Sequence, residues 1–243
     1  NLLAYELSPS ITLLEELLCK WFAKKIGFND SSGGIAASGG TLSNLNALIA
    51  ARNNAGLGSN PNSVLLISED AHSSFIKCIR IMGLDATNLV RIKTDNQGRM
   101  DISNLRKSLD KCLIENKKIF AIVATLGTTV RGAIDPIKEI SEICKERNIW
   151  LHIDGSIGGI FAITSIPIEG LNNINQANSI TINPQKIIGI TKTSSLLLVS
   201  NMNTLENTFS TGLPYISSKE DIVNRGEIGI QGSRPAEVIK LWL

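Results

Sequence analysis

Residues 120–124, Phe-Ala-Ile-Val-Ala, decide the fold class, because every side chain in this stretch is apolar. A strand without a polar face is typical of a parallel sheet that is covered on both sides. Residues 150–154, Trp-Leu-His-Ile-Asp, are the next candidate strand along the chain. Between them, Pro136 marks the start of a segment that we expect to be a helix ending near Arg147. This strand–helix–strand unit predicts an α/β protein.

The remainder of the chain continues the alternation. Further strands are predicted over residues 35–37, 64–67, 89–92, 179–182 and 195–199, and helices over residues 10–26, 41–54, 75–82 and 102–115. Such a pattern predicts a mainly parallel sheet between two layers of helices. Ligands of these sheets bind at the carboxyl ends of the strands, so we expect any site there.

Composition narrows the function classes. Of the 243 residues, 43% are hydrophobic and 19% are charged, which is ordinary for a soluble globular protein. The net charge of +2 gives no electrostatic reason to expect nucleic acid or an anionic membrane as a partner. No apolar run approaches the roughly 18 to 20 residues of a membrane span. Four dispersed cysteines and two histidines without metal-ligand spacing favour a reduced, cytoplasmic protein with no metal site.

Two polar segments lie where strands end. Ser38-Gly39-Gly40-Thr41 comes between a short strand and a helix, so its backbone can approach a phosphate closely, although such glycines are also ordinary turn residues. Asp154 ends an apolar strand, where a carboxylate is costly to bury unless it meets a cation or strong donors. The alternative for Asp154 is a cap over the glycines that follow it.

Lys186 follows Asn183-Pro184-Gln185, just after another predicted strand. A lysine at such a place is commonly a solvated surface residue. Beside a phosphate cradle and a buried carboxylate, it is instead a candidate amine for imine formation with a carbonyl group.

Taken together, six segments in order resemble the group II decarboxylases that depend on pyridoxal 5'-phosphate (PLP), relatives of the aspartate-aminotransferase fold. The segments are residues 38–45 (SGGTLSNL), 71–77 (AHSSFIK), 124–136 (ATLGTTVRGAIDP), 150–159 (WLHIDGSIGG), 177–186 (ANSITINPQK) and 231–242 (QGSRPAEVIKLW). The resemblance implies the large domain of fold type I, with a mainly parallel sheet. It also implies a carboxy-lyase that decarboxylates an L-amino acid as a homodimer.

The resemblance also assigns roles to residues of this chain. Lys186 would form the Schiff base with the cofactor, and Asp154 would pair with the pyridine nitrogen. His72 would stack on the ring, Thr129 would bind near its phenolic oxygen, and Tyr215 would deliver a proton from a loop. The cofactor-binding set that it implies is Gly39, Gly40, Thr41, His72, Thr129, Asp154, Ser156, Asn183, Gln185 and Lys186.

The sequence departs from the family pattern in places. Gln185 replaces a histidine that usually precedes the Schiff-base lysine, and an amide can bind phosphate but cannot titrate. We expect His152 to be structural and to lie on the face of its strand opposite Asp154. Family members are about twice as long, so residues 1–243 are interpreted as the PLP-binding large domain, cut at both ends.

Two alternatives to decarboxylation stay open. One is a different lyase reaction on the same fold, such as an elimination, an aldehyde-lyase cleavage or a desulfurase reaction, because the cofactor residues would be alike. The other is a non-catalytic PLP-binding remnant, which the length and Gln185 suggest. The substrate side chain cannot be deduced from these residues.

Overall fold

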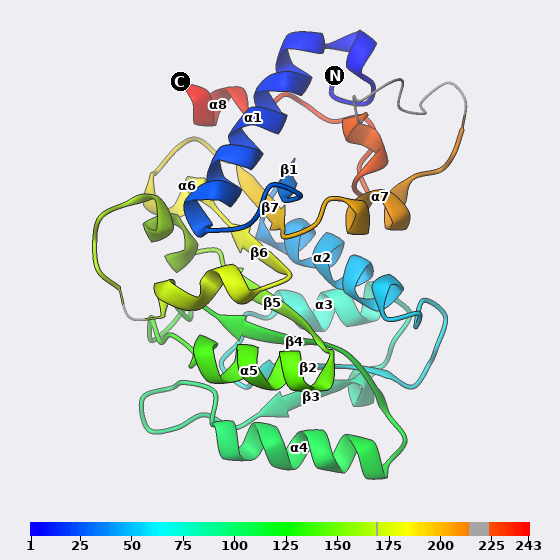
Figure 1. The fold of residues 1–243 in the computed structure, drawn as a ribbon, viewed down its shortest axis with the longest axis vertical. Coiled ribbons are helices and arrows are strands. Elements are labelled where there is room, and N and C mark those ends of the chain that lie inside the picture. Colours follow the sequence, from blue (N-terminus) through cyan, green and yellow to red (C-terminus); the bar gives the residue numbers. More distant parts are fainter. Residues whose placement is uncertain (169, 214–223) are drawn as a thin grey trace.

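The computed structural model describes residues 1–168, 170–213 and 224–243, and a seven-stranded sheet forms their centre (Figure 1). The strand order is β1-β7-β6-β5-β4-β2-β3. The strands are β1 (Gly33–Ala37), β2 (Ser63–Ser68), β3 (Leu89–Ile92), β4 (Lys118–Thr125), β5 (Trp150–Gly155), β6 (Ser179–Ile182) and β7 (Ser195–Val199). The predicted α/β class and the mainly parallel sheet are confirmed, with strand ends shifted by no more than a few residues.

One strand breaks the parallel pattern. Strand β7 pairs antiparallel with both β1 and β6, whereas the pairs from β6 across to β3 are parallel. The connection from β6 to β7 contains only one short helix, α6 (Pro184–Ile187). A parallel neighbour needs a crossover that carries the chain back along the sheet, usually through a full helix, and this connection is too short for one.

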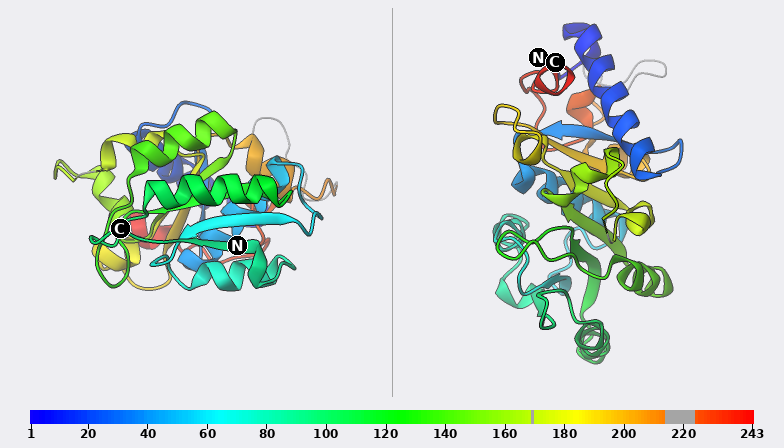
Figure 2. Two further views of the ribbon diagram at one scale, coloured as in Figure 1. Left: turned by 90° about the horizontal axis from the view of Figure 1, so that it is seen from below. Right: turned by 90° about the vertical axis from the view of Figure 1, so that its left-hand side faces the viewer.

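Helices cover both faces of the sheet, as Figure 2 shows. One face packs against α1 (Pro9–Ile26), α4 (Ile102–Ile114) and α5 (Ile137–Arg147), and the other packs against α2 (Gly40–Asn54) and α3 (Ser74–Ile81). Alternation along β4 divides its side chains between the two layers: Ile122 and Ala124 join the first, and Val123 joins the second. The fully apolar stretch that predicted the fold thus supplies both cores.

The remaining elements are short. They are α7 (Asn203–Phe209), α8 (Ile239–Trp242), and the 3-10 helices η1 (Tyr5–Leu7), η2 (Ala86–Asn88), η3 (Gly158–Ile163), η4 (Leu171–Gln176) and η5 (Arg225–Glu227). Helix α7 was not predicted, because it makes fewer than two turns and buries only Leu205, which leaves no periodic pattern to detect. None of the helices in the described ranges is long and apolar enough to cross a membrane.

A buried ion cluster links α1, near the start of the chain, to two arginines near its end. Glu15 of α1 accepts hydrogen bonds from Arg234 at 2.6 Å through both oxygens and from Arg225 at 3.0 Å. Burial alone would raise the pKa of Glu15, but the two guanidinium groups hold it below its usual value. Because removal of one partner leaves a buried charge unpaired, such clusters are costly to break, by about 3 to 5 kcal/mol.

Candidate active site

A cavity of about 150 Å³ opens at the carboxyl ends of β4, β5 and β6, next to the N-terminus of α2. It is lined by Gly40, Thr41, Asn44, His72, Thr125, Gly127, Thr129, Asp154, Ser156, Ile157, Asn183 and Lys186. The structure therefore brings together eight of the eleven residues that the sequence predicted for the site. Five of the lining side chains are polar and buried: Asn44, Thr125, Asp154, Ser156 and Asn183.

One end of the cavity has the geometry of an anion cradle. Helix α2 begins at Gly40, and its first backbone N–H groups point out of the helix end, where an anion is favoured. A Cβ atom at Gly40 would stand 2.7 Å from Asn183 Nδ2 and 3.0 Å from Ser156 Oγ. Glycine is therefore required here, because any side chain would displace two polar groups that converge on the helix N-terminus.

A buried hydroxyl pair fixes the orientation of Asn183. The Ser195 hydroxyl donates to Asn183 Oδ1 at 2.6 Å, and the Ser43 hydroxyl lies 2.7 Å from Ser195 Oγ. All three side chains are buried. Because its oxygen is engaged by Ser195, the amide presents Nδ2, a donor, to the cradle.

Asp154 lies at the floor of the same cavity. Its Oδ1 accepts a hydrogen bond from the Ser156 backbone N–H at 3.1 Å, and its Oδ2 accepts one from Asn44 Nδ2 at 3.3 Å. The side chain is only 4% exposed. Two donors therefore hold a carboxylate in one orientation at the end of β5, where it faces the cavity.

His152 lies behind Asp154, and the prediction that it occupies the opposite face of the strand was wrong. Side chains two residues apart on a strand share a face, so His152 and Asp154 both point toward α2. Asn44 contacts both residues, since its Oδ1 lies 3.1 Å from His152 Nε2. Burial lowers the pKa of His152 to about 4, against the opposite effect of the Asp154 carboxylate. The imidazole is therefore neutral at neutral pH.

The rim of the cavity is exposed, unlike its floor. His72, Thr129 and Lys186 line the opening and belong to the segments that follow β2, β4 and β6. His72 Nδ1 accepts a hydrogen bond from the Ser74 backbone N–H at 3.2 Å, which anchors the ring at the start of α3. The ring nitrogen that remains, Nε2, is the one available to other groups.

Two predicted site residues do not line the cavity, and a third lies outside the residues that the structure describes. Gly39 is the N-cap of α2, one residue outside it. Gln185 Oε1 accepts a hydrogen bond from the Ser194 backbone N–H at 2.7 Å. Tyr215 lies outside the described residues. The roles inferred for these residues stay predictions, as do the individual roles of the eight residues that the cavity brings together.

Sequence reasoning missed Asn44, Thr125, Gly127 and Ile157 as lining residues. Asn44 carries a signal that could have revealed it. It stands four residues after Gly40 on the same helix, and residues with this spacing share a face. A polar side chain that follows a phosphate cradle by one helical turn is thus expected to face the same cavity.

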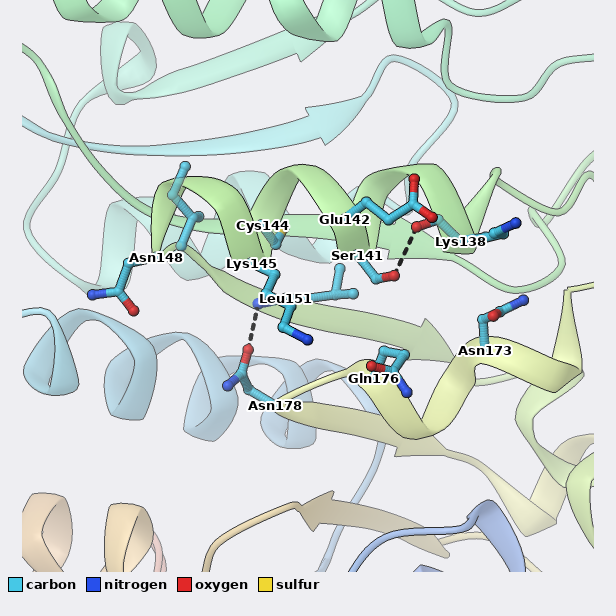
Figure 3. Close-up of a pocket in the computed structure, with 11 residues that line it drawn as sticks. Lys138, Ser141, Glu142, Cys144, Lys145, Asn148, Leu151, Asn173, Gln176 and Asn178 are labelled. Atoms are coloured by element: carbon cyan, nitrogen blue, oxygen red, sulfur yellow. Dashed lines mark hydrogen bonds between the residues drawn. The ribbon is translucent and has the colours of Figure 1, made fainter.

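A second, larger hollow of about 450 Å³ lies between α5 and η4, near the start of β5 (Figure 3). Four long exposed side chains form part of its wall: Lys138, Glu142, Lys145 and Gln176. The two hydrogen bonds that Figure 3 marks run from Ser141 Oγ to the Lys138 carbonyl at 2.7 Å and from the Leu151 N–H to Asn178 Oδ1 at 2.8 Å. Both hydrogen bonds pair backbone groups with nearby side chains, and neither places a donor toward the hollow.

Comparison with known proteins agrees with the family resemblance of the sequence. A family model described as the pyridoxal-dependent decarboxylase conserved domain matches residues 1–243. The aromatic-L-amino-acid decarboxylase of Bacillus atrophaeus is 32% identical over 234 residues, which make up 95% of this chain and 49% of that protein. The chain therefore spans about half the length of this relative.

Solved structures show the same likeness. The crystal structure of mouse CSAD superposes with a TM-score of 0.92 at 29% identity, over 99% of this chain and 52% of that one. The structure of Catharanthus roseus tryptophan decarboxylase in complex with L-tryptophan gives a TM-score of 0.89 at 26% identity, over 99% and 53%. The fold described above is thus shared along nearly all of this chain.

Proposed function

The chain belongs to the pyridoxal-dependent decarboxylase family, and from this premise we propose that it binds PLP and serves a carboxy-lyase that removes CO2 from an L-amino acid. The observation that carries the proposal is the convergence, in one cavity, of an anion cradle, a buried carboxylate and a lysine amine. These are the three groups that a phosphorylated pyridine aldehyde requires.

The residues fit the cofactor. The cradle of Gly40, Thr41, Ser156 and Asn183 would hold the phosphate, because it combines a helix N-terminus with side-chain donors. Asp154 would accept the hydrogen bond of the protonated pyridine nitrogen. When bound, PLP supplies an aldehyde that condenses with amines and a protonated ring that takes up the electrons left by CO2.

Each group of the chain then has a defined task. Lys186 Nζ would supply the amine that holds the cofactor. Asp154 keeps the proton on the ring nitrogen, because a fixed carboxylate favours the charged form of its partner. His72 and Thr129 would contact the ring from the rim, the first by stacking and the second through its hydroxyl. Tyr215 is the predicted donor of the proton that returns to the α-carbon.

Spectroscopy and an activity assay test the proposal together. Addition of PLP to the protein should produce a visible absorbance band that sodium borohydride abolishes. The full-length gene product should then release CO2 from one or more of the common L-amino acids. A protein that stays colourless would support the non-catalytic remnant, and a coloured protein that releases another product would support a different lyase reaction.

We also propose that the chain is the PLP-binding large domain of a longer homodimeric enzyme. The length of the relative supports the domain proposal. Exposed apolar side chains beside the cavity support the dimer: Val130, next to Thr129, is 92% exposed, and Ile187, next to Lys186, is 50% exposed. Sedimentation of the full-length protein should give twice the mass of one chain, and Val130→Glu should shift it toward the monomer.

A cytoplasmic location is the last part of the proposal. Cys19, Cys78, Cys112 and Cys144 are all free and buried, as expected of a protein that folds under reducing conditions. Fractionation of cells that express the full-length protein would test this location.

A further inference from the structure

A line of buried polar side chains leads away from the floor of the cavity. Trp150 Nε1 donates to Ser179 Oγ at 2.8 Å, and Ser179 Oγ lies 2.8 Å from His152 Nδ1. His152 Nε2 lies 3.1 Å from Asn44 Oδ1, and Asn44 Nδ2 donates to Asp154 Oδ2 at 3.3 Å. We call this line, from Trp150 through Ser179, His152 and Asn44 to Asp154, the floor chain.

The chemistry of its two ends fixes the direction of every bond. An ionised carboxylate only accepts, so Asn44 must turn its NH2 group toward Asp154 and its oxygen toward His152. That oxygen can only accept, and His152 Nε2 must therefore carry a proton. At the opposite end, the indole N–H of Trp150 can only donate, so Ser179 Oγ accepts there.

The tautomer of His152 follows from these constraints. Burial lowers the pKa of His152 to about 4, so the ring is neutral at neutral pH and carries a single N–H. With that proton on Nε2, Nδ1 is an acceptor, and the Ser179 hydroxyl donates to it. Every bond of the floor chain is then donated toward Asp154, and bonds aligned in one direction polarise and strengthen one another.

We propose that His152 is a positioning residue for Asp154, held as the neutral Nε2–H tautomer so that Asn44 presents its NH2 group to the carboxylate. If His152 carried its proton on Nδ1, Nε2 would face the Asn44 oxygen as a second acceptor, and the amide would lose its anchor. Under the proposed function, on which this inference rests, the floor chain thereby fixes the carboxylate that meets the pyridine nitrogen.

The tautomer can be measured without any cofactor. The chain has two histidines, His72 and His152, so isotope-labelled histidine gives two sets of ring signals, and His152→Gln assigns them. In a long-range proton–nitrogen correlation spectrum at neutral pH, we expect His152 with a protonated Nε2 and an unprotonated Nδ1. A protonated Nδ1, or a doubly protonated ring, would overturn the proposal.

A matched pair of variants tests the positioning effect on the cofactor. Ser179→Ala removes a hydroxyl of the floor chain. Thr181→Val removes a hydroxyl that is equally buried on the same strand and stands beside Asp154 in the sheet, and that makes no hydrogen bond within the described part of the chain. We expect Ser179→Ala to weaken PLP binding roughly fivefold, as loss of one hydrogen bond does, and to shift the visible band. Thr181→Val should leave both unchanged.

The pair also separates this inference from the proposed function. If the parent protein bound no PLP, the proposed function would fail before any variant was compared. If the parent bound PLP and the two variants behaved alike, in affinity and in the position of the visible band, the proposed function would stand and the positioning role of His152 would be wrong. Two further variants test whether a donor at position 152 is sufficient. The amide of His152→Gln can still donate to Asn44 Oδ1, so this variant should retain a higher affinity for PLP than His152→Met.

Discussion

Strand β5 has a hollow at each end, and the two differ in kind. The one at its amino end, between α5 and η4, has about 450 Å³, three times the roughly 150 Å³ of the cavity at its carboxyl end (Figure 3). The buried residues in the wall of the larger hollow are Cys144 and Leu151, whereas five buried polar side chains line the smaller one. Volume therefore does not mark the site in this molecule.

The difference follows from the cost of burying polar groups. An unpaired polar group away from water is costly, by about 1 to 3 kcal/mol, so a buried set persists where its members bond one another. Asp154 and Asn183 are held in this way, and each keeps one defined set of atoms toward the cavity. The lysines and glutamates around the larger hollow are solvated and have no such fixed direction. Residues of the larger hollow therefore provide matched controls for changes in and behind the cavity.

The largest effect is expected for Lys186→Ala. This variant should lose the visible absorbance of the PLP-treated protein entirely, because no other lysine among the described residues lines the cavity. Lys145→Ala, in the larger hollow, should absorb as the parent does. Absorbance spectra before and after borohydride provide the measurement. An unchanged band in Lys186→Ala would move the covalent site elsewhere.

Asp154→Asn should have the next largest effect. An amide cannot keep the ring nitrogen protonated, and loss of such a preorganised charge raises barriers by on the order of 3 kcal/mol, or about a hundredfold in rate. Decarboxylation by the full-length variant, measured as CO2 release, should fall accordingly while PLP stays bound. Glu142→Gln is the control, because it removes the same charge from the larger hollow. Comparable rates in the Asp154 variant and the parent would reduce Asp154 to a structural cap.

The smallest effect is expected for Ser195→Ala. Loss of its bond to Asn183 frees the amide to rotate, and a single buried hydrogen bond contributes about 1 kcal/mol, so PLP should bind roughly fivefold more weakly. Ser141→Ala, which removes an exposed hydroxyl bonded to a helix carbonyl, should not change the affinity. Titration of the visible band yields both constants. Equal affinities would mean that Asn183 needs no such anchor.

Sequence patterns predicted the fold more completely than they predicted the residues at the floor of the cavity. The apolar stretch at residues 120–124 and the polar residues after each strand located the sheet and the edge at which the cavity lies, because both depend on local residue type. The antiparallel β7 was not foreseen, since it depends on how far a connection can reach. Asn44 was missed and His152 was placed on the wrong face, although the period of a strand and one helical turn would have placed both residues.

Other features have no signal in a single sequence. The hydroxyl of Ser195 orients Asn183 from a neighbouring strand, and that pairing exists only once β6 and β7 lie antiparallel. Gln185, which the family resemblance places in the cofactor-binding set, accepts the N–H of Ser194 through its oxygen within the same connection, and no sequence pattern indicates that contact. Such partners are set by tertiary geometry rather than by spacing along the chain.

The most direct test of the account is to locate the lysine that PLP modifies. The parent protein would be incubated with PLP, reduced with borohydride, digested, and mapped by mass spectrometry. We predict a single modified lysine, Lys186, with Lys138 and Lys145 of the larger hollow unmodified. A label on either of those lysines, or one spread over many surface lysines, would contradict the assignment of the cavity at the carboxyl end of β5 as the cofactor site.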